Sequence, residues 1–222
     1  MSSDTPAHPH AHGHDHAHPH PTRPDAPERL TYYQTMEIAV RELLIEKGIV
    51  SADEVRRAIE AMDARTPAQG ARVVAHAWVD PAYKARLLAD GSAAVKELGI
   101  DVATTRLIVV ENKPKLHNLV VCTLCSCYPR TVLGLPPDWY KSRAYRSRAV
   151  REPRAVLREF GTVLPDDVEL RVHDSTADMR YLVLPERPAG TEGWSEERLA
   201  AIVTRDSMIG VAQPAGPAAA TV

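Results

Sequence analysis

The chain has 222 residues, of which 44% are hydrophobic and 25% charged, and its formal net charge is −2. This length suits one domain with an appendage, and the near-neutral charge gives no electrostatic reason to expect binding to nucleic acid or to an anionic membrane. No apolar run approaches the roughly 20 residues of a membrane span, and the N-terminus lacks the apolar core of a secretory signal. We therefore expect a cytoplasmic protein.

Residues 1–29 form a low-complexity segment rich in histidine. Seven of the ten histidines lie between His8 and His20, separated by Ala, Pro, Gly and Asp. Such a composition cannot bury enough apolar surface to offset the entropy of ordering, so the sequence predicts a disordered tail. Closely spaced imidazoles chelate divalent metals. Two interpretations of the tail stay open. It binds a divalent metal weakly while the active site is loaded, or it is an inert polar segment.

Residues 30–99 are predicted to form a helical arm. A spacing of three to four residues between apolar side chains predicts a first helix that ends at Gly48. Ser51 and Glu54 match a capping box for the second helix, and the third spans about residues 68–79. Asp80 and Pro81 predict the start of a fourth helix that ends at Gly99. The apolar stripes are narrow, which favours contact with another subunit over an independent core.

The pattern changes after residue 99 to short β-branched runs, which predict strands at 107–110 and 119–121 and a strand pair at 168–172 and 180–184. Between and after them, helices are expected at 136–150, 152–160 and 195–203, and a frayed tail at 213–222. The predicted fold class is α+β, in which the N-terminal helical arm precedes a layered αββα catalytic domain with short strands over residues 100–212.

The cysteine claw, residues 122–127, contains all three cysteines of the chain, Cys122, Cys125 and Cys127. Three thiols in six residues are too close for an ordinary disulfide framework, and the odd number leaves one unpaired. A tight turn lets all three sulfurs converge on one point, where soft thiolates bind a transition metal. The claw follows the second predicted strand, and loops at strand ends are common catalytic positions.

The ligand count narrows the choice of metal. Structural zinc sites and common iron–sulfur clusters use four side-chain ligands, whereas this cluster has three. The nearest further donors are the backbone amides of Ser126 and Cys127, which close chelate rings with the sulfurs. Deprotonation of an amide requires a strongly Lewis-acidic ion, which favours trivalent cobalt or iron. His117 or His173 completing a zinc site is the alternative, and a structural hydrogen-bonding role is the default for both.

The stretch V-C-T-L-C-S-C-Y, residues 121–128, resembles the metal claw of nitrile hydratase α subunits, and the resemblance covers roughly residues 30–212. Thr123 and Tyr128 resemble the cobalt branch of that family. Further matching motifs are residues 132–137 (VLGLPP), 139–142 (WYKS), 151–154 (REPR), 174–175 (DS), 180–181 (RY), 187–194 (RPAGTEGW) and 204–210 (TRDSMIG).

The resemblance implies hydration of a small-molecule nitrile to an amide, by the metal-binding α subunit of an αβ or α2β2 enzyme. The implied ion is Co3+, one per chain, with Fe3+ as the alternative. By the same resemblance Cys122 is the axial ligand, and Cys125, Cys127 and the amides of Ser126 and Cys127 are equatorial. Cys125 would carry a sulfinate and Cys127 a sulfenate, paired with arginines of the β subunit; a metal-loading activator protein is a further implied partner. Catalysis is expected at Cys127, Cys125 and Ser126, with the Cys127 sulfenate oxygen as nucleophile and a metal-activated water as its rival.

Two segments depart from the family pattern. Arg130-Thr131 stands where nitrile hydratases commonly have Trp-Pro, and residues 101–105 replace a Gly-Pro-Gln-Gly-Glu turn. An arginine in the substrate pocket favours an anion over an aromatic nitrile. Thiocyanate hydrolase, whose γ subunit resembles this chain in having arginine at that point, is therefore the alternative enzyme. A cobalt carrier, using the histidine tail and the claw, is the non-enzymatic alternative.

Overall fold

The computed structural model describes residues 30–217. The predicted histidine-rich tail at 1–29 and the last part of the predicted frayed tail, residues 218–222, lie outside the described residues. Residues 213–217 have no regular secondary structure. The chain divides into two compact units, residues 1–52 and 53–222. No helix in the described range is both long and apolar enough to cross a bilayer.

The first unit contains helix α1 (Tyr32–Glu46). Thr31 caps it, because its hydroxyl accepts a hydrogen bond from the Gln34 amide while the Gln34 side chain accepts one from the Thr31 amide. None of its residues is buried. Its exposed apolar side chains include Tyr32, Tyr33, Met36, Val40 and Leu43.

The second unit begins with α2 (Ala52–Asp63), which also has no buried residue. The next helices, α3 (Pro67–Val79), α4 (Pro81–Ala89) and α5 (Gly91–Glu97), all contribute to the core. Within the segment 30–99, α3–α5 carry buried core residues, whereas α1 and α2 carry none. The small side chains of α3 explain the difference, because Gly70 lets the helix approach the side chains of Leu133 and Met208 closely.

Two predicted helices are interrupted by capping residues. The helix predicted from Pro81 to Gly99 breaks at Asp90, whose carboxylate accepts a hydrogen bond from the Ala93 amide and starts α5. The helix predicted over residues 136–150 breaks at Ser142, whose hydroxyl caps the next helix through the Tyr145 amide. The remaining helices are α6 (Arg130–Leu133), α7 (Asp138–Lys141), α8 (Arg143–Arg151), α9 (Pro153–Glu159), α10 (Glu196–Ala201) and α11 (Arg205–Ile209).

The four strands form two separate parallel pairs. Strand β1 (Arg106–Glu111) pairs with β4 (Met179–Leu184), and β2 (Leu116–Val121) pairs with β3 (Glu169–Asp174). The prediction that the last two strands pair with each other was therefore wrong. Alternation of side chains identifies a strand but not its partner, and the fully buried Leu182–Leu184 run suits a strand covered on both faces.

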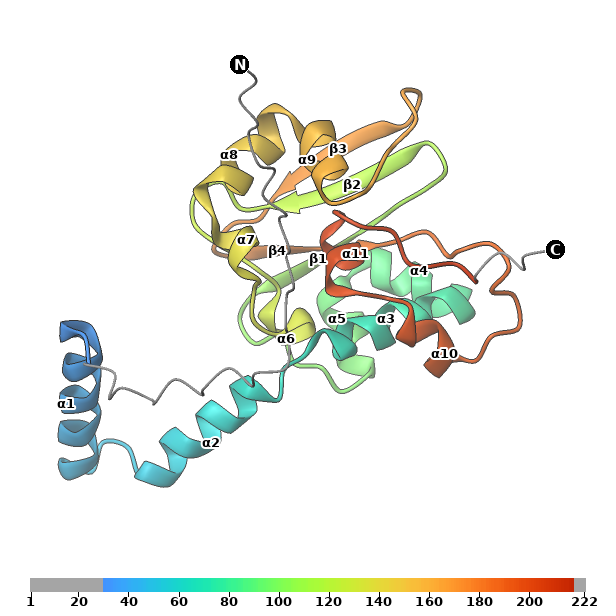
Figure 1. Cartoon of the computed structure of the whole chain (residues 1–222). Helices are drawn as coiled ribbons and strands as arrows, with labels where there is room; N and C mark the ends of the chain where they lie inside the picture. The colour runs from blue at the N-terminus through green and yellow to red at the C-terminus, as the bar shows by residue number, and fades with distance from the viewer. Residues whose placement is uncertain (1–29, 218–222) are drawn as a thin grey trace, which may run out of the picture. The chain divides into compact units, whose positions relative to one another are not determined.

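The two strand pairs lie between two sets of helices (Figure 1). Helices α4 and α5 pack on β1, whereas α8 packs on β2 and α9 on β3. The strand pairs also contact each other, β2 with both β1 and β4. The predicted α+β class with a layered αββα domain is confirmed. Fully buried side chains of the core include Val73, Tyr83, Leu87, Leu119, Leu133, Tyr140, Leu182 and Met208.

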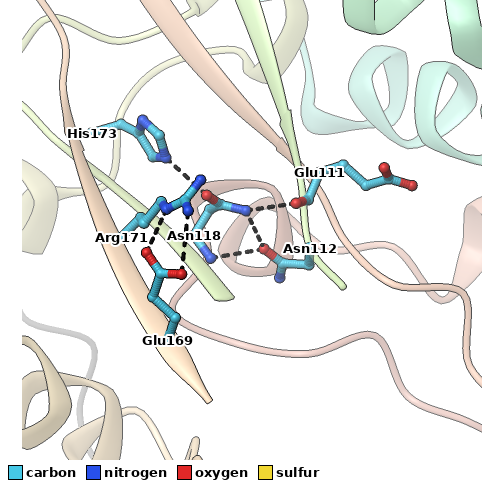
Figure 2. Close-up of polar contacts among 6 residues, drawn as sticks. All are labelled: Glu111, Asn112, Asn118, Glu169, Arg171 and His173. Atoms are coloured by element: carbon cyan, nitrogen blue, oxygen red, sulfur yellow. Dashed lines mark hydrogen bonds and ion pairs between the residues drawn. The ribbon is translucent and has the colours of Figure 1, made fainter. Parts of the chain in front are cut away.

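A buried polar network joins the ends of the strands (Figure 2). The Asn112 side-chain oxygen accepts hydrogen bonds from the amide and the side chain of Asn118, at 2.8 and 3.0 Å. The Asn118 side chain also donates to the Glu111 carbonyl, and its oxygen lies 2.8 Å from Nε2 of His173. Nε2 of His117 is 2.7 Å from the Gly210 carbonyl, and its Nδ1 is 3.3 Å from the side-chain nitrogen of Asn112. This network aligns β2 with β3 and with the end of α11.

Gly210 provides a test of this packing. Its φ is +93°, and a Cβ there would overlap the carbonyl oxygen of Asn118. We expect Gly210→Ala to lower the free energy of unfolding by at least about 3 kcal/mol, measured by urea denaturation. Gly161→Ala is the matched control, because Gly161 also has a positive φ (+83°) but open space around it. It should cost only about 1–2 kcal/mol, and equal losses for both variants would contradict the close packing.

A second test concerns the protonation of His117. Burial lowers its pKa from the ordinary value of 6.5. Since Nε2 donates to Gly210, Nδ1 accepts from the Asn112 amide group and a second proton has no acceptor there. The unfolded state therefore takes up this proton first, and the free energy of unfolding should fall as the pH drops below about 6.5. Denaturant titrations across this range should show a smaller slope in His117→Gln. The half-buried His173, whose pKa burial also lowers, still contributes in that variant. An unchanged slope would contradict the assignment.

Candidate metal centre

The claw begins where β2 ends and is fixed by contacts from two other segments. Cys122 follows directly after the buried Val121 and is itself fully buried. The amide and the hydroxyl of Thr123 donate to the carboxylate of Asp174, at the end of β3, at 2.9 and 2.5 Å. The Tyr140 hydroxyl donates to the Cys127 carbonyl at 2.9 Å. The rigid strand end and the two anchors thus determine the path of the loop.

The three sulfurs converge. Sγ of Cys125 lies 3.4 Å from Sγ of Cys122 and 3.1 Å from Sγ of Cys127. All three atoms lie within 4.8 Å of one another, and among residues 30–217 no other group of three potential metal-ligating side chains does so. The Cys125 amide donates to Sγ of Cys122 at 3.3 Å. The sulfurs therefore occupy one small volume, as the spacing predicted.

The thiols differ in their ease of ionisation. Hydrogen bonds from the neighbouring thiols of Cys127 and Cys122, and from the Ser126 and Cys127 amides, lower the pKa of Cys125 to about 7. Burial raises the pKa of Cys127 to about 12, with a further contribution from the adjacent Cys125. The Cys125 thiol therefore loses its proton readily. Deprotonation of the Cys127 thiol requires a compensating positive charge nearby. A cation bound among the sulfurs would supply it.

The three sulfurs lie close enough together to bind a single metal ion. The backbone amides of Ser126 and Cys127 are among the groups that lower the pKa of Cys125. His117 and His173 are hydrogen-bonded in the buried network and lie outside the sulfur group, which confirms their structural role. A zinc ion would therefore lack a fourth side-chain ligand from either histidine.

A cavity of about 350 Å³ lies beside the exposed side of the claw. It is lined by Val102, Ala103, Thr105, Cys125, Ser126, Cys127, Tyr128, Arg130, Thr131 and Arg180. Both segments that depart from the family pattern contribute to it. Two guanidinium groups and no carboxylate line the cavity, so it favours a neutral or anionic occupant.

Arg180 is a residue of the site that sequence reasoning missed. It lies on β4 opposite Leu107 of β1, and its positive charge acts on Cys127 in the direction that lowers the thiol pKa. The sequence motif contained Arg180, but only the parallel pairing of β4 with β1 brings it to the claw. This chain therefore has an arginine of its own near these sulfurs.

Known proteins are similar to this chain over most of its length. The family model described as nitrile hydratase, alpha chain, matches residues 31–212. The chain is 52% identical to the alpha subunit of a low-molecular weight cobalt-containing nitrile hydratase from Rhodococcus rhodochrous, over 82% of this chain and 89% of that protein. It is 47% identical to the gamma subunit of thiocyanate hydrolase from Thiobacillus thioparus, over 84% of this chain and 82% of that protein.

Among solved structures, the chain is similar to a recombinant thiocyanate hydrolase comprising partially modified cobalt centres. The TM-score is 0.79 at 47% sequence identity, and the match covers 84% of this chain and 91% of the other. The similarity thus extends over the fold and the claw together.

The anchor at Asp174 can be tested through metal uptake. Asp174→Ala removes the acceptor for both Thr123 donors, so the first half of the claw loses its fixed path. Replacing such a supporting residue typically costs 10- to 100-fold in metal affinity, so we expect about that reduction in uptake at limiting metal, measured by elemental analysis. Asp178→Ala, in the connection that follows Asp174 and leads to β4, is the matched control and should load normally. Equal loading of both variants would show that Asp174 does not position the claw.

Proposed function

The chain belongs to the nitrile hydratase α-chain family, and on this basis we propose that it is the metal-binding α subunit of a heteromeric enzyme that hydrates a nitrile to an amide. The observation that carries the proposal is the convergence of three sulfurs beside a cavity large enough for a small substrate. The heteromer, an αβ pair or its dimer, is inferred from the family's subunit composition.

Cobalt is the metal that we propose for this site, as Co3+ with one ion per chain, and Fe3+ is the alternative. Cys122, Cys125 and Cys127 would hold it together with the amides of Ser126 and Cys127. The names of the cobalt-containing relatives support this choice, as does Thr123 in the claw. The bound ion would supply Lewis acidity toward the nitrile or a water molecule. Loading by an activator protein and a cytoplasmic location are further parts of the proposal.

Oxidation of the claw would complete the site. We infer a sulfinate on Cys125 and a sulfenate on Cys127, which are successive steps of thiol oxidation. Cys125 is the exposed thiol and has the lowered pKa, so it is the most accessible to oxidants. The resulting anionic oxygens need cationic neighbours, because unpaired charge in a covered site is strongly disfavoured. Arg180 and Arg130 line the same cavity, and arginines of a β subunit would complete the set.

The reaction adds water across the C≡N bond without oxidation or reduction. One oxygen becomes bonded to the nitrile carbon, and the nitrogen gains two protons in forming the amide. The Cys127 sulfenate oxygen is the proposed nucleophile, and water then restores it; direct attack by water is the rival. Arg180 and Arg130 would orient the substrate, and the Tyr140 hydroxyl holds the Cys127 backbone in place.

A second candidate function is thiocyanate hydrolysis. The observation that favours it is the pair of guanidinium groups in the claw cavity, with no carboxylate among the lining residues. Thiocyanate is a small anion that carries a C≡N bond, so the same claw chemistry applies to it. The relative and the solved structure with that activity lend it further support.

The test is co-expression of this chain with a β-type chain in the presence of cobalt. We expect about one cobalt per α chain by elemental analysis, and mass spectrometry of the claw peptide should show two added oxygens on Cys125 and one on Cys127. Nitrile hydration should require both chains, and Cys127→Ala should abolish turnover because it removes a ligand and the proposed nucleophile. The chain without its partner should be nearly inactive.

An assay of thiocyanate hydrolysis with the same preparation distinguishes the two candidate functions. Arg130→Trp is the informative variant, since it replaces the cationic side chain by the residue common in nitrile hydratases. If thiocyanate is the substrate, the variant should lose kcat/KM for it by at least about tenfold, whereas turnover of a neutral nitrile should be retained or improved. Stoichiometric zinc with three unmodified thiols would contradict both candidates.

A further inference from the structure

The two arginines in the wall of the claw cavity have no acidic partner within residues 30–217. Neither Arg130 nor Arg180 takes part in any ion pair of the described chain. Within the same residues, the Arg180 guanidinium group makes one hydrogen bond, to the Met179 carbonyl at 3.4 Å. By contrast, Arg148 of α8 is paired with two glutamates. No carboxylate of the described residues lines the cavity, so its wall carries two positive charges that an anionic group can match.

The two arginines differ in their surroundings. Arg180 is half-buried, and its positive charge acts on Cys127 against the burial that raises the pKa of that thiol. Arg130 is exposed and begins α6, three residues after Cys127 in the sequence. Arg180 is therefore suited to neutralise an oxidised Cys127, which leaves the guanidinium group of Arg130 for a substrate.

A strained turn supplies apolar lining to the same cavity. Val102 and Ala103 belong to the lining, and Ala103 has a φ of +53°, in the left-handed region that is unfavourable for residues other than glycine. The Asp101 carboxylate accepts a hydrogen bond from the Ala103 amide at 2.9 Å. The Thr105 hydroxyl donates to the Val102 carbonyl at 3.0 Å. Because both bonds hold the turn in this conformation, the apolar lining is preformed.

Charge, lining and size together limit the substrate. A volume of about 350 Å³ is near the lower end of the roughly 300–1,000 Å³ typical of small-molecule sites, which favours a small substrate. A three-atom anion such as thiocyanate pairs with a guanidinium group but leaves the apolar lining in water. A neutral alkyl nitrile covers the apolar lining but leaves the positive charges unmatched. A short-chain nitrile that carries a carboxylate at its other end meets both requirements.

We propose that the claw cavity takes a short-chain cyanocarboxylate, with its nitrile group at the claw sulfurs and its carboxylate paired with Arg130. This inference rests on the proposed function, because it names the substrate class of that reaction. A guanidinium group is planar and binds a carboxylate through two parallel hydrogen bonds, and a neutral amide group lacks the matching charge. Water adds across the C≡N bond to give an amide, and the carboxylate is unchanged by the reaction.

A pair of substrates of nearly the same size tests the role of the charge. Cyanoacetate and cyanoacetamide differ only in the carboxylate, and both are assayed with the cobalt-loaded heteromer of this chain and a β-type chain. We expect kcat/KM to be at least about tenfold higher for cyanoacetate, through a lower KM, because a charge-assisted pair forms only with the carboxylate.

Arg130→Gln removes the charge of the proposed binding residue and keeps a hydrogen-bonding side chain. It should lower kcat/KM for cyanoacetate by at least about tenfold and leave the value for cyanoacetamide within about twofold. Arg158→Gln is the matched control, because Arg158 is an exposed arginine of α9 outside the cavity lining, and it should leave both values unchanged. Calorimetric titration with the monoamide of malonate, which is the product, should show the same loss of affinity in Arg130→Gln without turnover.

Three outcomes would overturn the proposed substrate class. If kcat/KM for cyanoacetate does not exceed the value for cyanoacetamide, or if Arg130→Gln lowers both values equally, the substrate class is wrong and nitrile hydration stands. Faster turnover of thiocyanate than of cyanoacetate would overturn it in favour of the second candidate function. No turnover of any nitrile by the cobalt-loaded heteromer would contradict the proposed function together with the substrate class.

Discussion

The close approach of three sulfurs at the end of one strand is the constraint on which the rest of the structure depends. Sγ atoms 3.1–3.4 Å apart cannot all ionise without a compensating cation, and the loop that carries them has no regular secondary structure. Its path is fixed by its surroundings, which are the buried end of β2, the Asp174 carboxylate at the end of β3 and the Tyr140 hydroxyl from α7. The layered fold thus serves to hold a six-residue loop in one conformation.

Positive charge surrounds the claw on two sides. Arg130 and Arg180 line the cavity next to Cys125 and Cys127, whereas three arginines of α8 line a second cavity together with Thr123. The two groups have different surroundings. The first lies where a substrate and oxidised sulfurs would be, so it bears on catalysis and selectivity. The second lies beside the exposed side chains of Leu124 and Val150.

The parallel strand pairs explain how distant segments meet at this point. Because β3 runs beside β2, Asp174 arrives next to the residue that follows Val121. Because β4 runs beside β1, Arg180 reaches the cavity from a position more than fifty residues after the claw in the sequence. The buried network of Asn112, Asn118 and His117 fixes the alignment, since its polar groups have partners only in this register.

The sequence by itself determined the cysteine claw and most helix starts. These features depend on local spacing, as in the two residues between Cys122 and Cys125 or the Asp80-Pro81 cap. Tertiary structure decided which strands pair, that α3–α5 belong to the core, and that Arg180 lies at the claw. The interruptions at Asp90 and Ser142 also needed it, because both residues are compatible with helix continuation until their side chains bond to the next turn. Side-chain alternation and helical periodicity indicate which face of a strand or helix is apolar. Which segment packs against that face depends on contacts between residues that are far apart in the sequence.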